Sequence, residues 1–344
     1  MNILLIQIKR IGDLILTTPA IAALRQKFPK AKITLVISQE AEPLLPALAG
    51  VDRTVVVRRN LSDIAGSFSI LRQKFDYCID FTRNDRSAFL SFLSRAPKRV
   101  VSYRVKRRAA WRGRVYNEFV QRRMRDMHTI DYNLSLIEPA GVSGTSPPVH
   151  LALPATAGER AHELLRHARI ERPFIIFHPG SARAEKFWQP DRWADVISHA
   201  AIRHKVNVIL TGGTSRTEQA HLAEIEAKLP RPVENSGAGS VVDLSGKMDL
   251  LTLAALIGQA QLLVTVDSAP MHLAAATATP QVVLFGPTNP YHWRPRQSPA
   301  IILQGESPAP VREFASKQPR LPMKLISTRA VIDAMNSLLS SPTK

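Results

Sequence analysis

The sequence predicts an α/β protein made of two doubly wound domains, each a parallel sheet with helices on both faces. Short apolar strand patterns alternate with helix patterns along nearly all of the 344 residues, which is typical of parallel sheets. A stretch rich in Gly, Pro, Ser and Thr, GVSGTSPPVHLALPATAG, interrupts that alternation near the middle and has the composition of a linker. We therefore expect domains at 1–150 and 151–325, and a C-terminal helix at 326–344 for which packing back on the first domain is one option.

In the first domain, each strand pattern is an apolar run bounded by turn residues. Between these runs, apolar residues recur at helical spacing. The expected strands are 2–8, 32–38, 53–57 and 76–81, and the expected helices are 19–28, 40–49 and a stretch through 69–75.

The second domain repeats this alternation and ends on an amphipathic helix pattern. The expected strands are 174–178, 207–210, 241–243, 261–267 and 281–285, and the expected helices are 157–170, 193–204, 218–229, 250–260, 269–278 and 327–341.

The composition is that of a globular protein, with 45% hydrophobic and 22% charged residues. No uninterrupted apolar run reaches the roughly 18 residues of a membrane-spanning helix, and the chain opens on a strand pattern rather than on a leader. The single cysteine, Cys78, lies in an apolar strand pattern and is expected to be an inert core thiol. These features favour a reducing cytoplasmic compartment.

The net charge of +18 is concentrated in one segment. Between Arg95 and Arg125 there are twelve Lys or Arg residues and one acid, Glu118, with aromatic residues interleaved. Three interpretations remain open: a solvated surface, a nucleic-acid patch, and a surface that meets anionic lipid. A solvated surface explains so dense a one-sided run poorly, and composition alone does not choose between the other two.

The turn after the first strand, KRIGDLILTTP, has one glycine followed directly by Asp13. A strand–glycine–helix turn normally cradles a phosphate on backbone N–H groups, so a carboxylate there is unexpected. From the residues alone, a structural cap explains Asp13 at least as well as a chemical role does.

Two strand-to-helix turns of the second domain have features of diphosphate and nucleotide binding. HPGSARAEKFW offers Ser181 as a hydroxyl donor and Lys186 as a cation that reaches back over the turn; the alternative is a surface lysine. LTGGTSRTEQ has two glycines and then Glu218, which suits a ribose hydroxyl or simply the first turn of a helix.

The third turn, VTVDSAPMHLAAA, is the most specific of the set. The strand ends at Asp267, and Ser268 and Ala269 lead into a helix of small residues whose free N–H groups suit an anion. His272, one turn later, either faces a ligand or packs. The chain lacks GxGxxG after the first strand, GxxxxGK[ST], HExxH and an evident metal-binding acidic pair. A metal-free reaction on a nucleotide diphosphate is the interpretation that remains.

Taken in order, these turns resemble glycosyltransferase family 9, the bacterial lipopolysaccharide heptosyltransferases. The matching pieces span nearly the whole chain: IGDLILTTPAIAALRQKFP, FDYCIDFTRNDRSAFLS, HPGSARAEKFWQPDRWADV, LTGG with Glu218, LSGKMDLLTLAALI, VTVDSAPMHLAAA and LFGPTNP. The resemblance implies a GT-B fold, in which two Rossmann-like domains face each other across a cleft, with the acceptor on the N-terminal side and the donor on the C-terminal side.

The resemblance also implies an inverting, metal-independent transfer of heptose from ADP-heptose, with no cofactor and with ADP as product. Asp13 would be the general base. The residues implied at the donor are Ser181, Lys186, Glu218, Met248, Asp267, Ser268, Ala269 and His272. The family often has Thr-Gly where this chain has Ser268-Ala269, which keeps the hydroxyl, adds a methyl group at the closest approach and leaves the donor's identity open.

The implied acceptor is a phosphorylated lipid A–core, met at the anionic inner face of the cytoplasmic membrane by a peripheral enzyme with no nucleic-acid partner. Its expected contacts are Arg83, Arg104, Lys106, Arg107, Arg108 and His128, of which Arg83 and His128 are equally well read as structural. The motifs DSAPMH and HWRPR favour a subtype that adds a branch heptose. Other hypotheses are a different donor or acceptor, a nucleotide-sugar epimerase, and a basic binding protein without enzyme activity. The oligomeric state is open.

Overall fold

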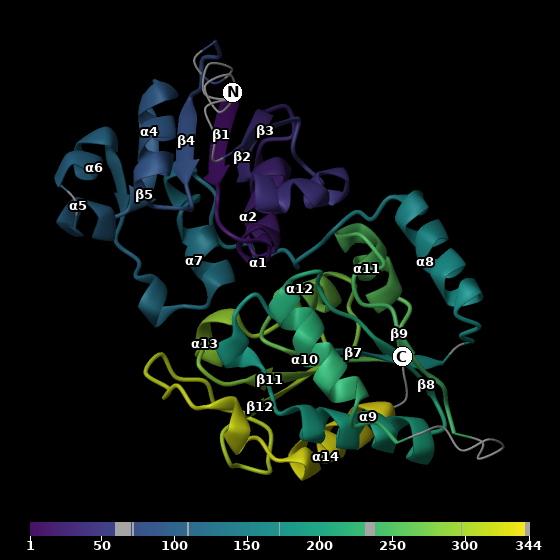
Figure 1. Cartoon of the computed structure of the whole chain (residues 1–344). Helices are drawn as coiled ribbons and strands as arrows, with labels where there is room; N and C mark the ends of the chain where they lie inside the picture. Colours follow the sequence, from purple (N-terminus) through teal and green to yellow (C-terminus); the bar gives the residue numbers. More distant parts are fainter. Residues whose placement is uncertain are drawn as a thin grey trace. The chain divides into compact units, whose positions relative to one another are not determined.

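The computed structural model describes residues 1–58, 70, 72–108, 110–171, 173–230, 238–296 and 298–340, and the side chains of residues 107, 108 and 110 lie outside this description. The chain consists of two compact units, Met1–Ala152 and Leu153–Lys344. Figure 1 shows that each unit is a sheet covered by helices. Each unit is described by itself below.

The first unit is built on a six-stranded parallel sheet in the order β3-β2-β1-β4-β5-β6. The central strand pairs on both sides, with Leu5 opposite Leu35 on one neighbour and Ile79 on the other. Its interior residues are fully buried, as expected of a parallel strand covered on both faces. The strands are β1 (Asn2–Gln7), β2 (Lys32–Ser38), β3 (Arg53–Val57), β4 (Tyr77–Asp80), β5 (Lys98–Ser102) and β6 (Glu118–Val120).

The helices of the first unit are short. The segment expected to be an α-helix at 40–49 is the 3₁₀ helix η1, because Pro43 and Pro46 have no N–H for an α-helical ladder. The helices are α1 (Ile11–Ile15), α2 (Thr18–Lys27), η1 (Gln39–Ala47), α4 (Asp85–Leu93), α5 (Arg104–Arg108), α6 (Ala110–Val115), η2 (Met124–Asp126), α7 (Thr129–Ser135) and η3 (Glu138–Ala140).

The second unit has a six-stranded parallel sheet in the order β12-β11-β10-β7-β8-β9. Counted from its own first strand, this is the strand order of the first sheet, so both units have the doubly wound Rossmann topology. The strands are β7 (Phe174–His178), β8 (Asn207–Leu210), β9 (Val241–Asp243), β10 (Leu262–Val266), β11 (Gln281–Phe285) and β12 (Ala300–Gln304).

The helices of the second unit cover both faces of its sheet. They are α8 (Ala155–His167), η4 (Ala184–Lys186), α9 (Pro190–Arg203), α10 (Arg216–Glu226), α11 (Leu250–Ile257), α12 (Ala269–Ala276), α13 (Pro290–Trp293), η5 (Met323–Leu325) and α14 (Thr328–Ser340).

The C-terminal helix corrects one expectation. Packing of this helix back on the first domain was one option, but α14 lies on the second unit, against α9 and strands β10, β11 and β12. Its apolar stripe, Ala330, Val331, Ala334 and Met335, is part of the core that also contains Trp193. An amphipathic helix is held where its apolar face is buried, and this sheet provides that surface.

The α/β class and the parallel sheets are confirmed, and every strand expected from the sequence is present. Three strands were missed: β5, β6 and β12. The first two lie in the basic segment, where cations interrupt the apolar pattern, and β6 has only three residues. β12 is an edge strand of five residues that pairs with β11 alone. The helix expected through 69–75 falls largely on residues outside the described ranges.

Cys78 lies in β4 and is fully buried. Burial raises the pKa of its thiol to about 12, which confirms the inert core thiol. Among the helices that the structure describes, none combines the length and hydropathy needed to cross a bilayer.

Candidate active site

In a doubly wound sheet, ligands bind at the carboxyl ends of the strands where the strand order reverses. In the first unit that point lies between β1 and β4, and in the second unit between β7 and β10. Asp13 follows β1 and Arg83 follows β4. Lys186 follows β7 and Asp267 follows β10. The chain therefore places its most conspicuous charged residues at both switch points.

Lys186 and Asp267 form a buried ion pair in the second unit. The Lys186 Nζ atom lies 2.6 Å from Asp267 Oδ2 and donates to the Asp267 backbone oxygen at 2.7 Å. The two residues are 8% and 5% exposed, so the surface-lysine alternative is wrong. Thr288 Oγ1, after β11, donates to the same Oδ2 at 2.5 Å. Three strand-end loops are thus joined through one carboxylate.

Two histidines of the second unit, His178 and His272, are buried and neutral. Burial lowers the pKa of His178 to about 4, and its Nδ1 lies 3.0 Å from Thr211 Oγ1. Burial also lowers the pKa of His272 to about 4, while Asp267 partly opposes that shift. His272 Nδ1 has no partner among the described residues, which leaves a polar atom for a ligand to satisfy.

Glu218 lies between two glycine turns. A Cβ added to Gly180 would lie 2.4 Å from one Glu218 carboxylate oxygen, and one added to Gly213 would lie 2.5 Å from the other. Ser215 caps α10, accepting from the Glu218 N–H at 3.3 Å and donating to its carboxylate at 2.9 Å. The absence of side chains at both glycines is what allows the carboxylate to occupy this place.

The remaining donor candidates surround the same edge of the second sheet. Ser268 is the N-cap residue of α12, but its side chain makes no capping bond; its Oγ donates to the Val266 oxygen at 3.4 Å. The first-turn N–H groups of α12 are therefore not satisfied by that hydroxyl. Ser181 is buried and accepts from the Arg183 N–H at 3.3 Å. Ala269 and Met248 are half-buried.

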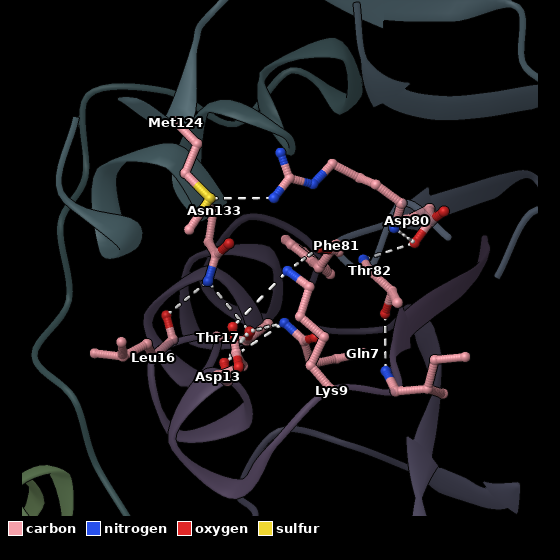
Figure 2. A network of polar contacts seen from close by, with 12 residues as sticks. Gln7, Lys9, Asp13, Leu16, Thr17, Asp80, Phe81, Thr82, Met124 and Asn133 are labelled. Carbon is pink, nitrogen blue, oxygen red and sulfur yellow. Dashed lines mark hydrogen bonds and ion pairs between the residues drawn. The ribbon is translucent and has the colours of Figure 1, made fainter. Parts of the chain in front are cut away.

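In the first unit, Asp13 lies in the first turn of α1, whose N-cap is Arg10. Its carboxylate is therefore not the cap of that helix. Lys9 Nζ lies 3.8 Å from Asp13 Oδ1 and donates to the Phe81 oxygen at 3.1 Å, and Figure 2 shows the lysine reaching between the two loops. The Asp13 side chain is 13% exposed, and burial lowers the pKa of Lys9.

The backbone at Asp13 is fixed by a buried polar network (Figure 2). Thr17 Oγ1 donates to the Asp13 oxygen at 2.8 Å and accepts from Gln7 Nε2 at 2.9 Å. Asn133 Nδ2, from α7, donates to the Leu16 oxygen at 3.0 Å. This network holds the turn that carries the carboxylate, which is the arrangement a positioned reactive group requires.

The second loop at this switch point is organised by Asp80, which is fully buried. Asp80 accepts from the N–H groups of Thr82 at 2.7 Å and Arg83 at 3.0 Å. On its other oxygen it accepts from Ser87 Oγ at 2.7 Å and the Tyr116 hydroxyl at 2.5 Å. Four donors on one carboxylate compensate its burial.

Arg83 has a backbone φ of 68°, a strained value for a residue with a side chain. Its guanidinium lies 4.9 Å from the centre of the Tyr132 ring and donates to Met124 Sδ at 3.1 Å. A ring face and a thioether are weak partners for a cation. Arg83 therefore remains a candidate for binding an anionic ligand.

The other acceptor candidates are a buried helix cap, His128, and cations of α5. His128 is 1% exposed and caps α7, accepting from the Ile130 N–H at 3.2 Å, which is a structural role. Arg104 and Lys106 lie on α5 and are exposed. Arg107 and Arg108 belong to the same helix, but their side chains lie outside the described part of the structure.

No group of three or more His, Cys, Asp or Glu side chains capable of holding a metal ion occurs among the residues that the structure describes.

Comparison with known proteins identifies the family. The model of glycosyltransferase family 9 (heptosyltransferase) matches residues 68–320. A lipopolysaccharide heptosyltransferase 3 of Escherichia coli is 28% identical over 345 residues, covering 96% of this chain and 97% of that protein. The chain belongs to glycosyltransferase family 9.

Solved structures of similar proteins have the same fold as this chain. The glycosyl transferase family 9 protein from Veillonella parvula DSM 2008 is similar with a TM-score of 0.83 at 24% identity, covering 98% of this chain and 97% of that one. The E. coli ADP-heptose lps heptosyltransferase II is similar with a TM-score of 0.77 at 20% identity, covering 98% of both chains. The protein is thus a glycosyltransferase with the GT-B fold, as the resemblance implied.

Two side chains at the candidate site, Lys9 and Thr288, were not predicted from the sequence. Lys9 was not singled out, although it lies four residues before Asp13, the spacing that pairs charges across a helical turn. Thr288 lies in the motif LFGPTNP, but nothing in that motif indicates that its hydroxyl donates to Asp267.

Proposed function

We propose that this glycosyltransferase moves a heptose from ADP-heptose to the inner core of lipopolysaccharide, with Asp13 as the general base. The observation that carries the proposal is the position of Asp13, partly buried at the switch point of the first sheet and fixed by a network from three elements. In a family 9 glycosyltransferase, a positioned carboxylate at that place has a direct chemical use.

The proposed step is a single inverting displacement. The acceptor hydroxyl loses its proton to the Asp13 carboxylate as its oxygen forms a bond with C1 of the donor sugar. The bond between C1 and the β-phosphate oxygen breaks, and ADP leaves with that electron pair. No metal ion or cofactor takes part in the proposed step. Lys9 Nζ lies 3.8 Å from Asp13 Oδ1, so a cation stands beside the proposed base.

On the donor side, we assign the diphosphate to Lys186, Ser181, Ser268, Ala269 and the start of α12. A cation together with free N–H groups suits a diphosphate. Asp267 then holds sugar hydroxyls, and His272 offers its unpaired Nδ1 near the diphosphate. Glu218 receives the adenosine ribose, and Met248, half-buried after β9, packs on adenine.

On the acceptor side, we assign Arg83 and the exposed cations of α5 to a phosphorylated lipid A–core. Arg104 and Lys106 are the described members of that group, and Arg107 and Arg108 follow them in the helix; contact through His128 remains a prediction. Because such an acceptor is lipid-linked, we propose that the enzyme works as a peripheral protein at the anionic inner face of the cytoplasmic membrane, with no nucleic-acid partner. Cations near such a surface contribute on the order of 1 kcal/mol each.

The branch-heptose subtype is the more specific proposal. The E. coli relative that is 28% identical is a lipopolysaccharide heptosyltransferase 3, and the sequence motifs DSAPMH and HWRPR favour the same subtype. We propose that the acceptor sugar is itself a heptose.

The direct test is ADP release from ADP-heptose, with and without heptosylated lipid A–core, and with ADP-glucose and UDP-glucose as matched donors. The proposal expects release that requires both ADP-heptose and the core and that continues in EDTA. Release from another donor, or only with another glycan, would replace the substrates. Turnover without an acceptor would indicate an epimerase, and salt-sensitive binding with no turnover would indicate a binding protein.

A further inference from the structure

Three large apolar side chains are exposed on neighbouring helices of the first unit. Phe89 and Phe92 of α4 are 52% and 63% exposed, and Trp111 of α6 is 51% exposed. Among the described residues, the other large hydrophobic side chains with comparable exposure, Met1, Ile202 and Val241, are scattered over other elements. A cluster of exposed aromatic side chains indicates an interaction surface more strongly than single exposed residues do.

The two helices that carry these side chains are packed together (Figure 1). Phe89 and Phe92 are three residues apart, so they lie on the same outward side of α4, while Ala88 and Leu90 face the core. An ion pair between Asp85 and Arg112, with 3.1 Å between Oδ1 and Nε, ties α4 to α6 beside Trp111. Phe89, Phe92 and Trp111 are called the α4–α6 face below.

Cations follow α4 directly in the chain. Arg95 and Lys98 are exposed, and Phe92, Leu93, Arg95 and Arg99 line a shallow depression at the end of α4. The described acids on α4, β5, α5, α6 and β6 are Asp85, which is paired with Arg112, and Glu118. Exposed aromatic side chains beside an excess of positive charge are complementary to a surface that is apolar inside and anionic outside.

We propose that the α4–α6 face is a docking surface for an anionic phospholipid bilayer. The three aromatic side chains enter the boundary between headgroups and acyl chains, where aromatic rings are favoured. The cations that follow α4 meet lipid phosphates in the same pose. Stable attachment without a membrane-spanning helix generally needs two such signals together. The inference rests on the proposed function in one respect: a lipid-linked acceptor gives the enzyme a reason to lie on this surface.

The test is binding to vesicles that contain no lipopolysaccharide, so that acceptor recognition plays no part. Vesicles of phosphatidylcholine alone are compared with vesicles containing phosphatidylglycerol, by co-sedimentation and by tryptophan emission. Trp111 is a built-in reporter, because Trp188 and Trp193 are 1% and 0% exposed and Trp293 is only half-exposed. The proposal expects binding to the anionic vesicles, with a shift of Trp111 emission to shorter wavelength.

The decisive variant is Phe89→Ala/Phe92→Ala, matched by Ile202→Ala, which removes an equally exposed apolar side chain from α9 in the second unit. Partial burial of two Phe rings predicts that the double variant lowers the vesicle partition coefficient roughly tenfold or more, whereas Ile202→Ala leaves it unchanged. Arg95→Gln/Lys98→Gln should weaken binding to anionic vesicles and make it less sensitive to salt.

Three results would overturn the inference: equal binding to neutral and anionic vesicles, equal loss in the double variant and in Ile202→Ala, or a double variant that binds as the wild type does. A double variant that instead changes the oligomeric state in vesicle-free solution would show a protein interface. The proposed function is tested separately by turnover, so an enzyme that transfers heptose without binding vesicles would refute this inference alone.

Discussion

Lys186 Nζ and Asp267 Oδ2 lie 2.6 Å apart, and this buried pair joins the loops after β7 and β10 at the switch point of the second sheet. A buried ion pair is weak evidence for stability, because desolvation offsets much of the attraction. Its value here is positional, since it holds a cation and a carboxylate where a diphosphate sugar would meet both.

Lys186→Met should weaken donor binding strongly. The variant removes the cation and leaves Asp267 buried, with Thr288 as its remaining side-chain partner among the described residues. Breaking such a buried pair is expected to lower the free energy of unfolding by about 3–5 kcal/mol. We expect ADP-heptose affinity, measured by calorimetry, to fall at least tenfold. Lys228→Met, at an exposed lysine near α10, is the control. Equal affinities for both variants would remove Lys186 from the donor site.

Gly180→Ala and Gly213→Ala should each displace Glu218. The new methyl groups would lie 2.4 Å and 2.5 Å from its carboxylate oxygens, closer than any unstrained contact. We expect weaker binding of ADP and adenosine. Gly158→Ala is the matched control, because its Cβ would meet nothing within 4 Å and its helix should gain about 0.5–1 kcal/mol. An unchanged ADP affinity in both variants would exclude Glu218 from nucleoside binding.

The buried histidines predict loss of stability in acid. Burial lowers the pKa of His272 to about 4 in the folded protein, against an ordinary value of 6.5 in the unfolded chain. Its contribution is therefore full above pH 6.5 and is lost as the pH falls toward 4, because the unfolded chain binds the proton first. Between pH 7 and 5 wild type should lose about 2 kcal/mol more than His272→Gln, measured by urea denaturation. Parallel losses in both proteins would contradict a neutral buried His272.

Asp80 should contribute more to the stability of the first unit than its partner Tyr116. Asp80→Asn turns one acceptor oxygen into an amide donor that faces bonded donors, and we expect a loss of about 3 kcal/mol in the free energy of unfolding. Tyr116→Phe removes one hydrogen bond of 2.5 Å and should cost about 1 kcal/mol. Denaturation curves of the two variants check the order, and a reversed order would show that Asp80 does not organise the loop.

The fold could be predicted from the sequence because buried parallel strands are continuous apolar runs, and β1, β7 and β10 are clear examples. Asp13, Lys186 and Asp267 could be predicted as site residues because each follows such a strand. The three residues of β6 are too few to show a strand pattern by themselves, and β12, which pairs with β11 alone, was not recognised although its residues are mostly apolar. The bond from Thr288 to Asp267 and the burial of Lys186 depend on contacts between separate strand-end loops, which a local sequence pattern does not show.

The measurement closest to the central claim compares wild type with Asp13→Asn in acceptor-dependent release of ADP from ADP-heptose. Asparagine keeps the shape of the side chain but accepts a proton poorly, so kcat should fall by a factor of about 10² to 10⁴. Donor affinity should be unchanged, because Asp13 belongs to the first unit and the donor residues to the second. Acceptor-dependent turnover that persists unchanged in Asp13→Asn would contradict the account and leave Asp13 a structural residue of the α1 turn.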